Sequence, residues 1–305
     1  MKKVLITGAN GFIGSRLTQY LIEKELSVIA VIEPGMKIPS DFFQKDITIL
    51  ELKMEDISRT QIDIPDNIDL IYHFAWAGVD SRRKNLEEIQ LKNIQYGLNI
   101  LKMAEARNIP KVVCPGSASE YACFDGIITG KESPEPADMY GAVKAAVRYV
   151  MSMDAKSKGI QLVWTLITSI YGPGRMDNNL ITYAITSFLK HEIPSFTKLE
   201  QQWDYLYIAD LIYGLYLIGE FGKGGKAYPL GSGLYRPMWE YVHIIRDIID
   251  PTLPMRIGVL PYKAKKIDHS RLDISNLCED TGFIPKYPFE IGVRETIEYF
   301  KKNLK

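Results

Sequence analysis

The chain has 305 residues, 46% of them apolar, and it carries 37 basic and 37 acidic side chains. This composition is typical of a globular protein with room for one large domain or two smaller ones. A net charge of zero gives no field that would attract nucleic acid or an anionic membrane surface, so we expect neither as a partner.

The cysteines and the first residues indicate where the protein acts. Cys114, Cys123 and Cys278 show no C-x-x-C spacing, and an odd number of cysteines suits a reducing compartment better than a disulfide framework. The opening MKKVLITGANGFIG contains Asn10 and three glycines, which interrupt any signal-peptide core. No apolar run approaches the roughly 20 residues of a membrane span. We therefore expect a soluble, cytoplasmic protein.

Short apolar runs alternate with helix-period segments along the first half of the chain. The predicted strands are KVLIT (3–7), VIAVI (28–32), ITILEL (47–52), DLIYHFAW (69–76), KVVC (111–114) and LVWTLI (162–167). The predicted helices include SRLTQYLIEKE (15–25) and a long segment at 86–108. Apolar strands that alternate with helices are typical of a parallel sheet covered on both faces. The sequence therefore predicts a doubly wound α/β fold.

The pattern loosens after Tyr171. Residues 180–192 have a helical pattern, and 202–221 read as a strand that leads into a helix. No repeat or low-complexity linker separates the two parts of the sequence. We therefore expect a smaller domain interleaved with the end of the first. The first domain is expected at 1–168 plus about 202–234, and the second at about 169–201 plus 235–305.

A glycine-rich turn, TGANGFIG at 7–14, directly follows the first predicted strand and opens a helix. Gly8 permits a tight turn, Gly11 lets the backbone approach a pyrophosphate, and Gly14 allows close helix–strand packing. The helix N-terminus then offers free N–H groups to the phosphate. The predicted dinucleotide-binding residues of this turn are Gly8, Asn10, Gly11, Phe12, Ile13 and Gly14.

Tyr140 and Lys144 form a Y-x-x-x-K pattern, which places both side chains on one face of a helix. A free phenol, with a pKa near 10, is a poor base at neutral pH, and lowering its pKa by about three units needs roughly 4 kcal/mol. A nearby ammonium in a dry site can supply that stabilisation. In isolation the same pattern also suits a surface helix with a packed tyrosine and a solvated lysine.

Four motifs occur in a fixed order: TGANGFIG, HFAWAG, GSASEY and YGAVK. In this order they resemble the extended short-chain dehydrogenase/reductase family, and more narrowly its NAD-dependent nucleotide-sugar epimerases, dehydratases and ketoreductases. The likeness covers nearly the whole chain, including WDYLYIAD at 203–210 and the C-terminal DHSRLDISNLCEDTGFIP. It implies a Rossmann dinucleotide-binding domain with a smaller α/β substrate-binding domain. It also implies a nicotinamide cofactor, a nucleotide-activated sugar as substrate, and a homodimer.

The resemblance assigns catalytic roles. In this family the tyrosine of Y-x-x-x-K is the acid–base group, and the lysine binds the nicotinamide ribose and lowers the phenol pKa; here these are Tyr140 and Lys144. A serine or threonine four residues before a loop tyrosine orients the reacting oxygen, which selects Ser117. Ser119 and Glu120 are further candidate sugar contacts.

The residues after Ser117 narrow the reaction. Sugar 4,6-dehydratases carry an Asp-Glu pair there, to remove a proton and to protonate the leaving hydroxyl, whereas this chain has Ala118 and Ser119. Elimination therefore lacks its acid and base. What remains is hydride transfer at a ring carbinol, reversible as in a 4-epimerase or net as in a 4-ketoreductase or dehydrogenase.

The end of the second predicted strand bears on the cofactor. NAD enzymes usually place an acid there for the adenosine ribose, and NADP enzymes an arginine for the phosphate. The resemblance puts Ile32 at the usual aspartate position and Glu33 where NADP-dependent relatives have arginine. A carboxylate would repel a 2′-phosphate, so the sequence favours NAD. NADP remains the alternative, because Lys37 follows closely.

Further cofactor contacts come from the resemblance alone. It places Ala75 and Trp76 in the loop after the fourth strand, near the cofactor, although relatives more often have a small residue at position 76. Asn93 matches a helix asparagine near the same site. His73 is a strand histidine whose expected role is core packing. The remaining histidines, His191, His243 and His269, show no metal-ligand spacing, so we expect no metal.

The substrate contacts depart from the family pattern. Asn179 matches a residue that contacts the nucleotide diphosphate, but Trp203 stands where an arginine commonly grips the nucleotide, and Ser169 where asparagine is frequent. Trp203 either stacks on the substrate or belongs to the core. Three residues are candidates to replace the positive charge of that arginine: Arg236, Lys263 and Arg271. Each could equally well be a solvated surface charge.

Three hypotheses follow from the sequence. The first is a nucleotide-sugar 4-epimerase or 4-ketoreductase with Tyr140 as acid and base. The second is an oxidoreductase of the same family that acts on a non-nucleotide carbonyl or carbinol, which Trp203 and Ser169 favour. The third is a non-catalytic, cofactor-binding regulator, against which an intact Ser–Tyr–Lys set argues.

Overall fold

The structure is a computed structural model that describes residues 1–44, 47–59, 62–80, 82–177, 179–262 and 272–304. The chain clusters into two compact units. The first comprises Met1–Ile167, Ile212–Leu230 and Ser275–Phe283, and the second comprises Thr168–Leu211, Gly231–Ile274 and Ile284–Lys305. The assignment of one domain to the cofactor and the other to the substrate stays a prediction.

The first unit is built on a seven-stranded sheet with the order β10-β6-β5-β4-β1-β2-β3. Every strand pair in this sheet is parallel, which confirms the predicted α/β fold. The strands are β1 (Lys3–Thr7), β2 (Ser27–Ile32), β3 (Ile47–Glu51), β4 (Leu70–His73), β5 (Lys111–Ser117), β6 (Gln161–Ile167) and β10 (Ala227–Leu230). Because β1 pairs with β2 on one side and β4 on the other, the turn after β1 lies where the strand order reverses.

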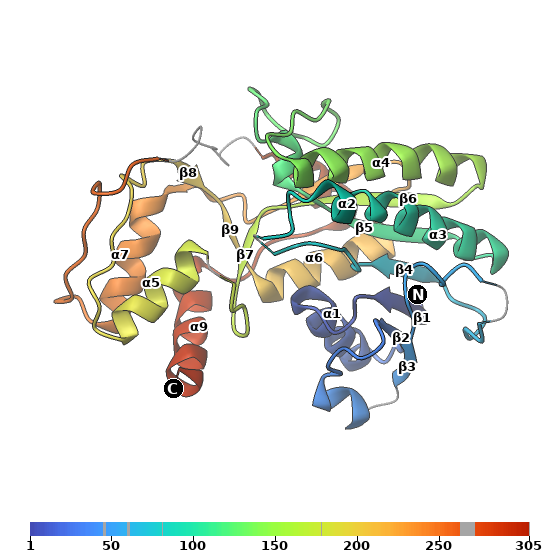
Figure 1. Cartoon of the computed structure of the whole chain (residues 1–305), viewed down its shortest axis with the longest axis horizontal. Helices are drawn as coiled ribbons and strands as arrows, with labels where there is room; N and C mark the ends of the chain where they lie inside the picture. Colours follow the sequence, from blue (N-terminus) through green and yellow to red (C-terminus); the bar gives the residue numbers. More distant parts are fainter. Residues whose placement is uncertain (45–46, 60–61, 81, 178, 263–271, 305) are drawn as a thin grey trace. The chain divides into compact units, whose positions relative to one another are not determined.

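Helices cover both faces of this sheet, as the apolar strands predict (Figure 1). Tyr72 of β4 donates a hydrogen bond to the Leu215 carbonyl of α6 on one face, and Cys114 of β5 contacts Met151 of α4 on the other. The elements of this unit are α1 (Phe12–Glu23), η1 (Ser40–Gln44), α2 (Glu87–Gln90), α3 (Lys92–Ala106), η2 (Ala118–Tyr121), α4 (Met139–Ser157), α6 (Ile208–Phe221, from Ile212) and α8 (Ser275–Thr281).

The structure corrects three details of the predicted elements. The strand predicted at 69–76 ends earlier, at His73, which lies opposite the last residue of β1, Thr7. The helix predicted at 86–108 is divided at Leu91 into α2 and α3. The sequence pattern gave no sign of β10, a short edge strand that contains Pro229.

The second unit contains two small two-stranded sheets and three helices among its described residues. Its elements are β7 (Ser169–Tyr171) parallel to β9 (Tyr205–Tyr207), β8 (Gln202–Trp203) antiparallel to β11 (Arg236–Pro237), α5 (Leu180–Leu189), α7 (Met238–Ile249) and α9 (Phe289–Asn303). Aromatic rings fill its core, where Phe289 lies 4.9 Å from Tyr171 and 4.6 Å from Tyr241 between ring centroids. Such edge and tilted contacts add to the burial of each ring.

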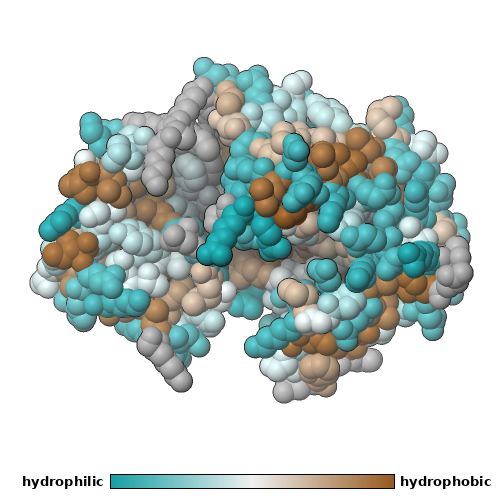
Figure 2. Space-filling model, viewed as in Figure 1, coloured by the Kyte–Doolittle hydropathy of each residue, from teal (hydrophilic) through white to brown (hydrophobic). Residues whose placement is uncertain are grey.

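Apolar residues, in brown, are interspersed with hydrophilic ones over the face of the molecule that Figure 2 presents. Among the helices within the described ranges, none combines the length and the apolar content that crossing a membrane requires.

Gly8 and Gly159 provide a matched test of the packing after β1. Both have φ of +67°, but a Cβ on Gly159 would meet no atom within 4 Å, whereas on Gly8 it would lie 2.8 Å from the Ala75 nitrogen. We expect Gly159→Ala to lower the free energy of unfolding by about 1 kcal/mol, the cost of the left-handed conformation. Gly8→Ala should cost about 1–3 kcal/mol more because of overpacking. Denaturant unfolding measures both, and equal losses would contradict the close approach of the two loops.

Candidate active site

The glycine turn joins two neighbouring strand ends. A Cβ on Gly8 would strike the backbone of Ala75, so the turn after β1 touches the loop after β4. A Cβ on Gly14 would lie 2.2 Å from the Gly8 carbonyl oxygen, so α1 packs directly on the turn. Gly11 precedes α1 without a side-chain cap, and the first turn of α1 has no acidic residue. An uncapped helix N-terminus beside a crowded glycine turn fits the pyrophosphate of a dinucleotide.

Thr7 and His73 connect the same two strands beneath this turn. The Thr7 hydroxyl oxygen accepts a hydrogen bond from the Ala75 N–H (3.2 Å) and lies 2.8 Å from His73 Nδ1. Burial, together with the charge of Lys144, lowers the pKa of His73 to about 3. The imidazole is therefore neutral, and we assign Nδ1 as the acceptor of the Thr7 hydroxyl proton. This agrees with the expected packing role of His73.

Two buried amides hold the loop after β4. Asn93 Oδ1 accepts from the Ala77 N–H (2.8 Å), and its Nδ2 donates to the carbonyls of Ala77 and Gln90. Gln90 Nε2 donates to the Gly78 carbonyl (2.7 Å), while its Oε1 accepts from the Trp76 indole N–H (3.1 Å). Asn93 therefore positions the loop predicted to line the cofactor. The sequence analysis did not identify Gln90.

Tyr140 and Lys144 project from the first turns of α4. Asp138 caps the helix just before its first residue, and its carboxylate accepts the Gly141 N–H (2.9 Å). The Lys144 ammonium lies 5.7 Å from the centre of the Tyr140 ring and donates to the Pro115 carbonyl (2.7 Å). Burial lowers the pKa of Lys144 to about 7, against the opposing effect of Glu120 and Cys114. Lys144 is therefore buried and not solvated, and near neutral pH its amine is only partly protonated.

Ser117 is the last residue of β5 and caps the short helix η2 that follows it. Its hydroxyl accepts the Ser119 N–H (3.2 Å), and the Glu120 carboxylate in turn accepts the Ser117 N–H (2.8 Å), so the two form a capping box. The turn packs on α4, because a Cβ on Gly141 would lie 2.4 Å from the Ser119 carbonyl oxygen. Ser117 also lies two residues after Pro115, whose carbonyl oxygen accepts the hydrogen bond from Lys144.

Glu120 is buried, although the sequence suggests it as a sugar contact. Its exposed fraction is 0%, and Oε1 also accepts the Trp164 indole N–H (3.0 Å). Its Oε2 atom has no hydrogen-bond partner among the described residues. Burial raises the pKa of this carboxyl. In this arrangement Glu120 supports Ser117 and faces the charge of Lys144 from inside the protein.

The other predicted cofactor residues lie around the ends of β1 and β2. Glu33 directly follows β2 and is exposed. Asn10 donates a side-chain hydrogen bond to the Lys37 carbonyl (3.3 Å), which ties the glycine turn to the loop after β2. Phe12 and Ile13 are the first residues of α1, and both are partly buried.

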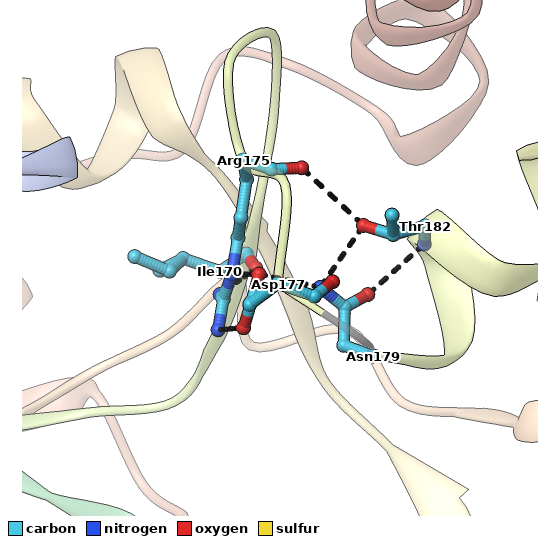
Figure 3. A network of polar contacts seen from close by, with 5 residues as sticks. All are labelled: Ile170, Arg175, Asp177, Asn179 and Thr182. Atoms are coloured by element: carbon cyan, nitrogen blue, oxygen red, sulfur yellow. Dashed lines mark hydrogen bonds and ion pairs between the residues drawn. The ribbon is translucent and has the colours of Figure 1, made fainter. Parts of the chain in front are cut away.

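In the second unit, Asn179 caps α5 (Figure 3). Its Oδ1 accepts the Thr182 N–H (3.0 Å), and its Nδ2 donates to the Asp177 carboxylate (2.9 Å). Asp177 also accepts two hydrogen bonds from Arg175, at 2.7 and 2.8 Å, and Arg175 contacts the Ile170 carbonyl. The sequence analysis did not single out this arginine, because its role depends on the fold of the loop.

Trp203 and Arg236 lie opposite each other in the β8–β11 pair. The Trp203 side chain is partly exposed, and its ring lies 6.3 Å from that of Tyr205. Arg236 forms an ion pair with Glu290, which raises the pKa of the guanidinium. Lys263, Arg271 and His269 lie outside the described residues. Within the described ranges, no three His, Cys, Asp or Glu side chains are grouped to hold a metal.

These features define a Rossmann-type protein. The sheet is parallel, a glycine turn lies where the strand order reverses, and a buried lysine lies beside a tyrosine at the carboxyl ends of the strands. The model of the NAD dependent epimerase/dehydratase family matches residues 4–231, and the chain belongs to this family.

Relatives and solved structures are similar along most of the chain. An uncharacterised protein of Methanocaldococcus jannaschii is 24% identical over 99% of this chain and 97% of its own length. The dTDP-glucose 4,6-dehydratase of Shigella flexneri is 27% identical, but the match spans only 55% of this chain and 48% of that enzyme.

Two solved structures share the fold. The UDP-N-acetylglucosamine 4-epimerase of Methanobrevibacter ruminantium, in complex with UDP-N-acetylmuramic acid, has a TM-score of 0.87 at 23% identity and covers 99% of both chains. The UDP-glucuronic acid 4-epimerase of Bacillus cereus, in complex with UDP-glucuronic acid and NAD, has a TM-score of 0.84 at 21% identity, again with 99% coverage of both. At this identity the likeness establishes the fold.

The buried neutral His73 makes a prediction for stability against pH. Its pKa is about 3 in the folded protein and near 6.5 in an unfolded chain, so between these values the unfolded state binds more protons and stability falls as the pH falls. Between pH 7 and pH 5 the loss due to this residue should be about 2 kcal/mol. In denaturant unfolding, His73→Gln should abolish this loss of stability between pH 7 and pH 5. His191→Asn, at an exposed site, should leave the loss unchanged. An unchanged pH dependence in His73→Gln would show that His73 is not held neutral.

Proposed function

We propose that the protein modifies a nucleotide-activated sugar by NAD-dependent hydride transfer at a ring carbinol or ketone, as a 4-epimerase or a 4-ketoreductase. One observation carries this proposal: Ser117, Tyr140 and a buried Lys144 gather at the carboxyl end of β5, beside the loop that the glycine turn contacts. Named relatives and fold neighbours that act on or bind nucleotide sugars support the substrate class.

In the proposed oxidation, the carbinol loses a hydride from its carbon and a proton from its oxygen, and the two go to different acceptors. NAD, when bound, supplies the hydride acceptor. The Tyr140 oxygen takes the proton of the carbinol as its C–H bond breaks, so that the carbinol becomes a ketone and the phenolate becomes a phenol. The Lys144 ammonium stabilises the phenolate before this transfer, and the Ser117 hydroxyl orients the reacting oxygen. In the reverse direction the ketone carbon would take a hydride from the reduced cofactor while its oxygen takes the proton from Tyr140. This is a net reduction when the ketone is the substrate, and an epimerisation when the hydride returns to the opposite face of the ketone just formed.

The turn after Ser117 argues against dehydration, although several relatives are dehydratases. Elimination needs a base for the proton next to the ketone and an acid for the departing hydroxyl. Positions 118 and 119 hold alanine and serine. The adjacent carboxyl, Glu120, is fully buried and hydrogen-bonded to Ser117 and Trp164, so it is not available to the substrate.

A second candidate is an oxidoreductase acting on a substrate without a nucleotide. By family resemblance, Trp203 stands where an arginine commonly grips the nucleotide, and Ser169 where asparagine is frequent. Arg236 is already paired with Glu290. Mass spectrometry of small molecules retained by the purified protein, followed by turnover assays with a panel of nucleotide sugars, separates the two. A retained or turned-over nucleotide sugar supports the first candidate. Turnover only of free carbonyl compounds supports the second, and no turnover at all supports a cofactor-binding regulator.

A homodimer is the expected assembly, by family resemblance. The outer face of α4 offers a surface for it, since Tyr149, Val150 and Met153 are 53%, 37% and 71% exposed. We propose this face as the dimer contact, because exposed apolar side chains spaced along one helix favour association. Sedimentation velocity measures the assembly of the native protein and of Met153→Glu. The proposal expects the native protein to be a dimer and the variant a monomer, and a variant that remains a dimer would contradict it.

Tyr140→Phe should abolish turnover while cofactor affinity remains nearly unchanged, because the substitution removes only the transferable proton. General acid–base catalysis typically contributes about 10²–10⁴-fold. The matched control is Tyr287→Phe, which changes a 39% exposed tyrosine outside α4 and should leave the rate unaltered. Turnover of the Tyr140 variant within threefold of the native protein would end the assignment of Tyr140 as acid and base.

NAD should bind more tightly than NADP, because the exposed carboxylate of Glu33 follows β2 and would repel a 2′-phosphate. Glu33→Arg should move the ratio of affinities toward NADP by exchanging repulsion for a bidentate ion pair. Calorimetric titration of both cofactors measures the ratio. Glu23→Arg, at an exposed site near the far end of α1, controls for the change in net charge. Tighter NADP binding by the native protein would be the opposite of the expectation and would point to Lys37.

A further inference from the structure

Trp76 lies directly on the ammonium group of Lys144. The Lys144 nitrogen is 3.4 Å from the centre of the Trp76 ring, well within the range of about 6 Å over which a cation is attracted to an aromatic face. The edge of the same indole meets Tyr140, with ring centroids 6.0 Å apart and planes at 74°. One indole therefore contacts both members of the Tyr–Lys pair.

The indole is fixed in this position from behind. Its N–H donates to Gln90 Oε1 (3.1 Å), and Gln90 is fully buried with its Nε2 bonded to the Gly78 carbonyl (2.7 Å). A Cβ on Gly78 would lie 2.6 Å from that nitrogen, so the chain at this point leaves room for the amide. These hydrogen bonds fix the orientation of the Trp76 indole, so its contact with Lys144 is not the chance position of a surface ring.

The ammonium has few other partners to keep it charged. Lys144 is 3% exposed and donates to the Pro115 carbonyl. The titratable groups that act on it come from three packed elements: Glu120 of η2 and Cys114 of β5 favour its charged form, and neutral His73 of β4 senses its charge. Tyr140 faces it from its own helix. The attraction between a cation and an indole face is stronger when the cation is desolvated than at an exposed site.

We propose that Trp76 is a positioning residue for the Tyr140–Lys144 pair: its indole face holds the Lys144 ammonium in its charged form beside Tyr140, in a site that excludes water. The inference rests on the proposed function for its catalytic meaning. It adds a residue that the Ser–Tyr–Lys motif does not contain. It also means that the cofactor ribose, which the family lysine binds, shares this ammonium with the indole.

The test compares Trp76→Phe with Trp76→Leu, because the two replacements are close in bulk and differ mainly in the presence of an aromatic face. The readout is the titration of Lys144 in the intact, cofactor-free protein, followed by ¹³C NMR of lysines labelled at Cε. The Lys144 signal is assigned by its loss in Lys144→Met. Trp239→Leu, which removes a 40% exposed tryptophan on α7, is the matched control.

We expect the pKa of Lys144 to be about one unit lower in the Leu variant than in the Phe variant, with Phe closer to the native protein and the control unchanged. A purely structural role for Trp76 would move stability without separating Phe from Leu. An equal or higher pKa in the Leu variant would overturn the proposal. If the Leu variant does not fold, Trp76→Met replaces it in the same comparison.

This measurement needs neither substrate nor turnover, so it separates the inference from the proposed function. If no sugar is turned over but the pKa of Lys144 differs between the Phe and Leu variants, the proposed reaction fails and the role of Trp76 stands. If sugars are turned over and the variants titrate together, the reaction stands and the role of Trp76 is lost.

Discussion

The candidate site is organised around one buried positive charge. Taking an ammonium out of water costs several kcal/mol unless partners replace its hydration. The partners of Lys144 come from separate segments of the first unit: the Pro115 carbonyl, the Trp76 ring and the charge of Glu120. Each partner in turn requires support, Trp76 from Gln90 and Glu120 from Trp164. Much of the surrounding arrangement follows from keeping this one group inside the protein.

Most of the fold could be predicted from the sequence because strands buried on both faces leave a strong apolar signature. β1, β2 and β6 correspond closely to the apolar runs that indicate them. β10 could not be found in this way, since it has four residues, contains Pro229 and follows a glycine-rich turn. Its place is decided by pairing with β6 at the sheet edge, where a proline needs no partner for its missing N–H.

The candidate site was predictable only where its residues are local in sequence. Spacing alone places Tyr140 and Lys144 on one face of a helix, and a strand–turn–helix pattern places the glycines. The contact between Trp76 and Lys144 joins segments that are far apart in the chain and depends on how β4 and β5 pair. Asn179 shows the reverse case, because its family role was inferred from position, whereas its amide caps α5 and binds Asp177 in the structure.

The unusual residues near Lys144 depend on one another. A Cβ on Gly116 would lie 2.1 Å from the Trp164 nitrogen and 2.4 Å from Glu120 Oε1, so Gly116, Trp164 and Glu120 are compatible only as a set. Trp76 likewise needs Gln90 to accept its N–H. The two sets act on Lys144 differently, since a carboxylate attracts the ammonium through its charge and an indole through its ring face. Replacement of Trp76 by a small residue would therefore leave both Lys144 and Gln90 without one of their partners.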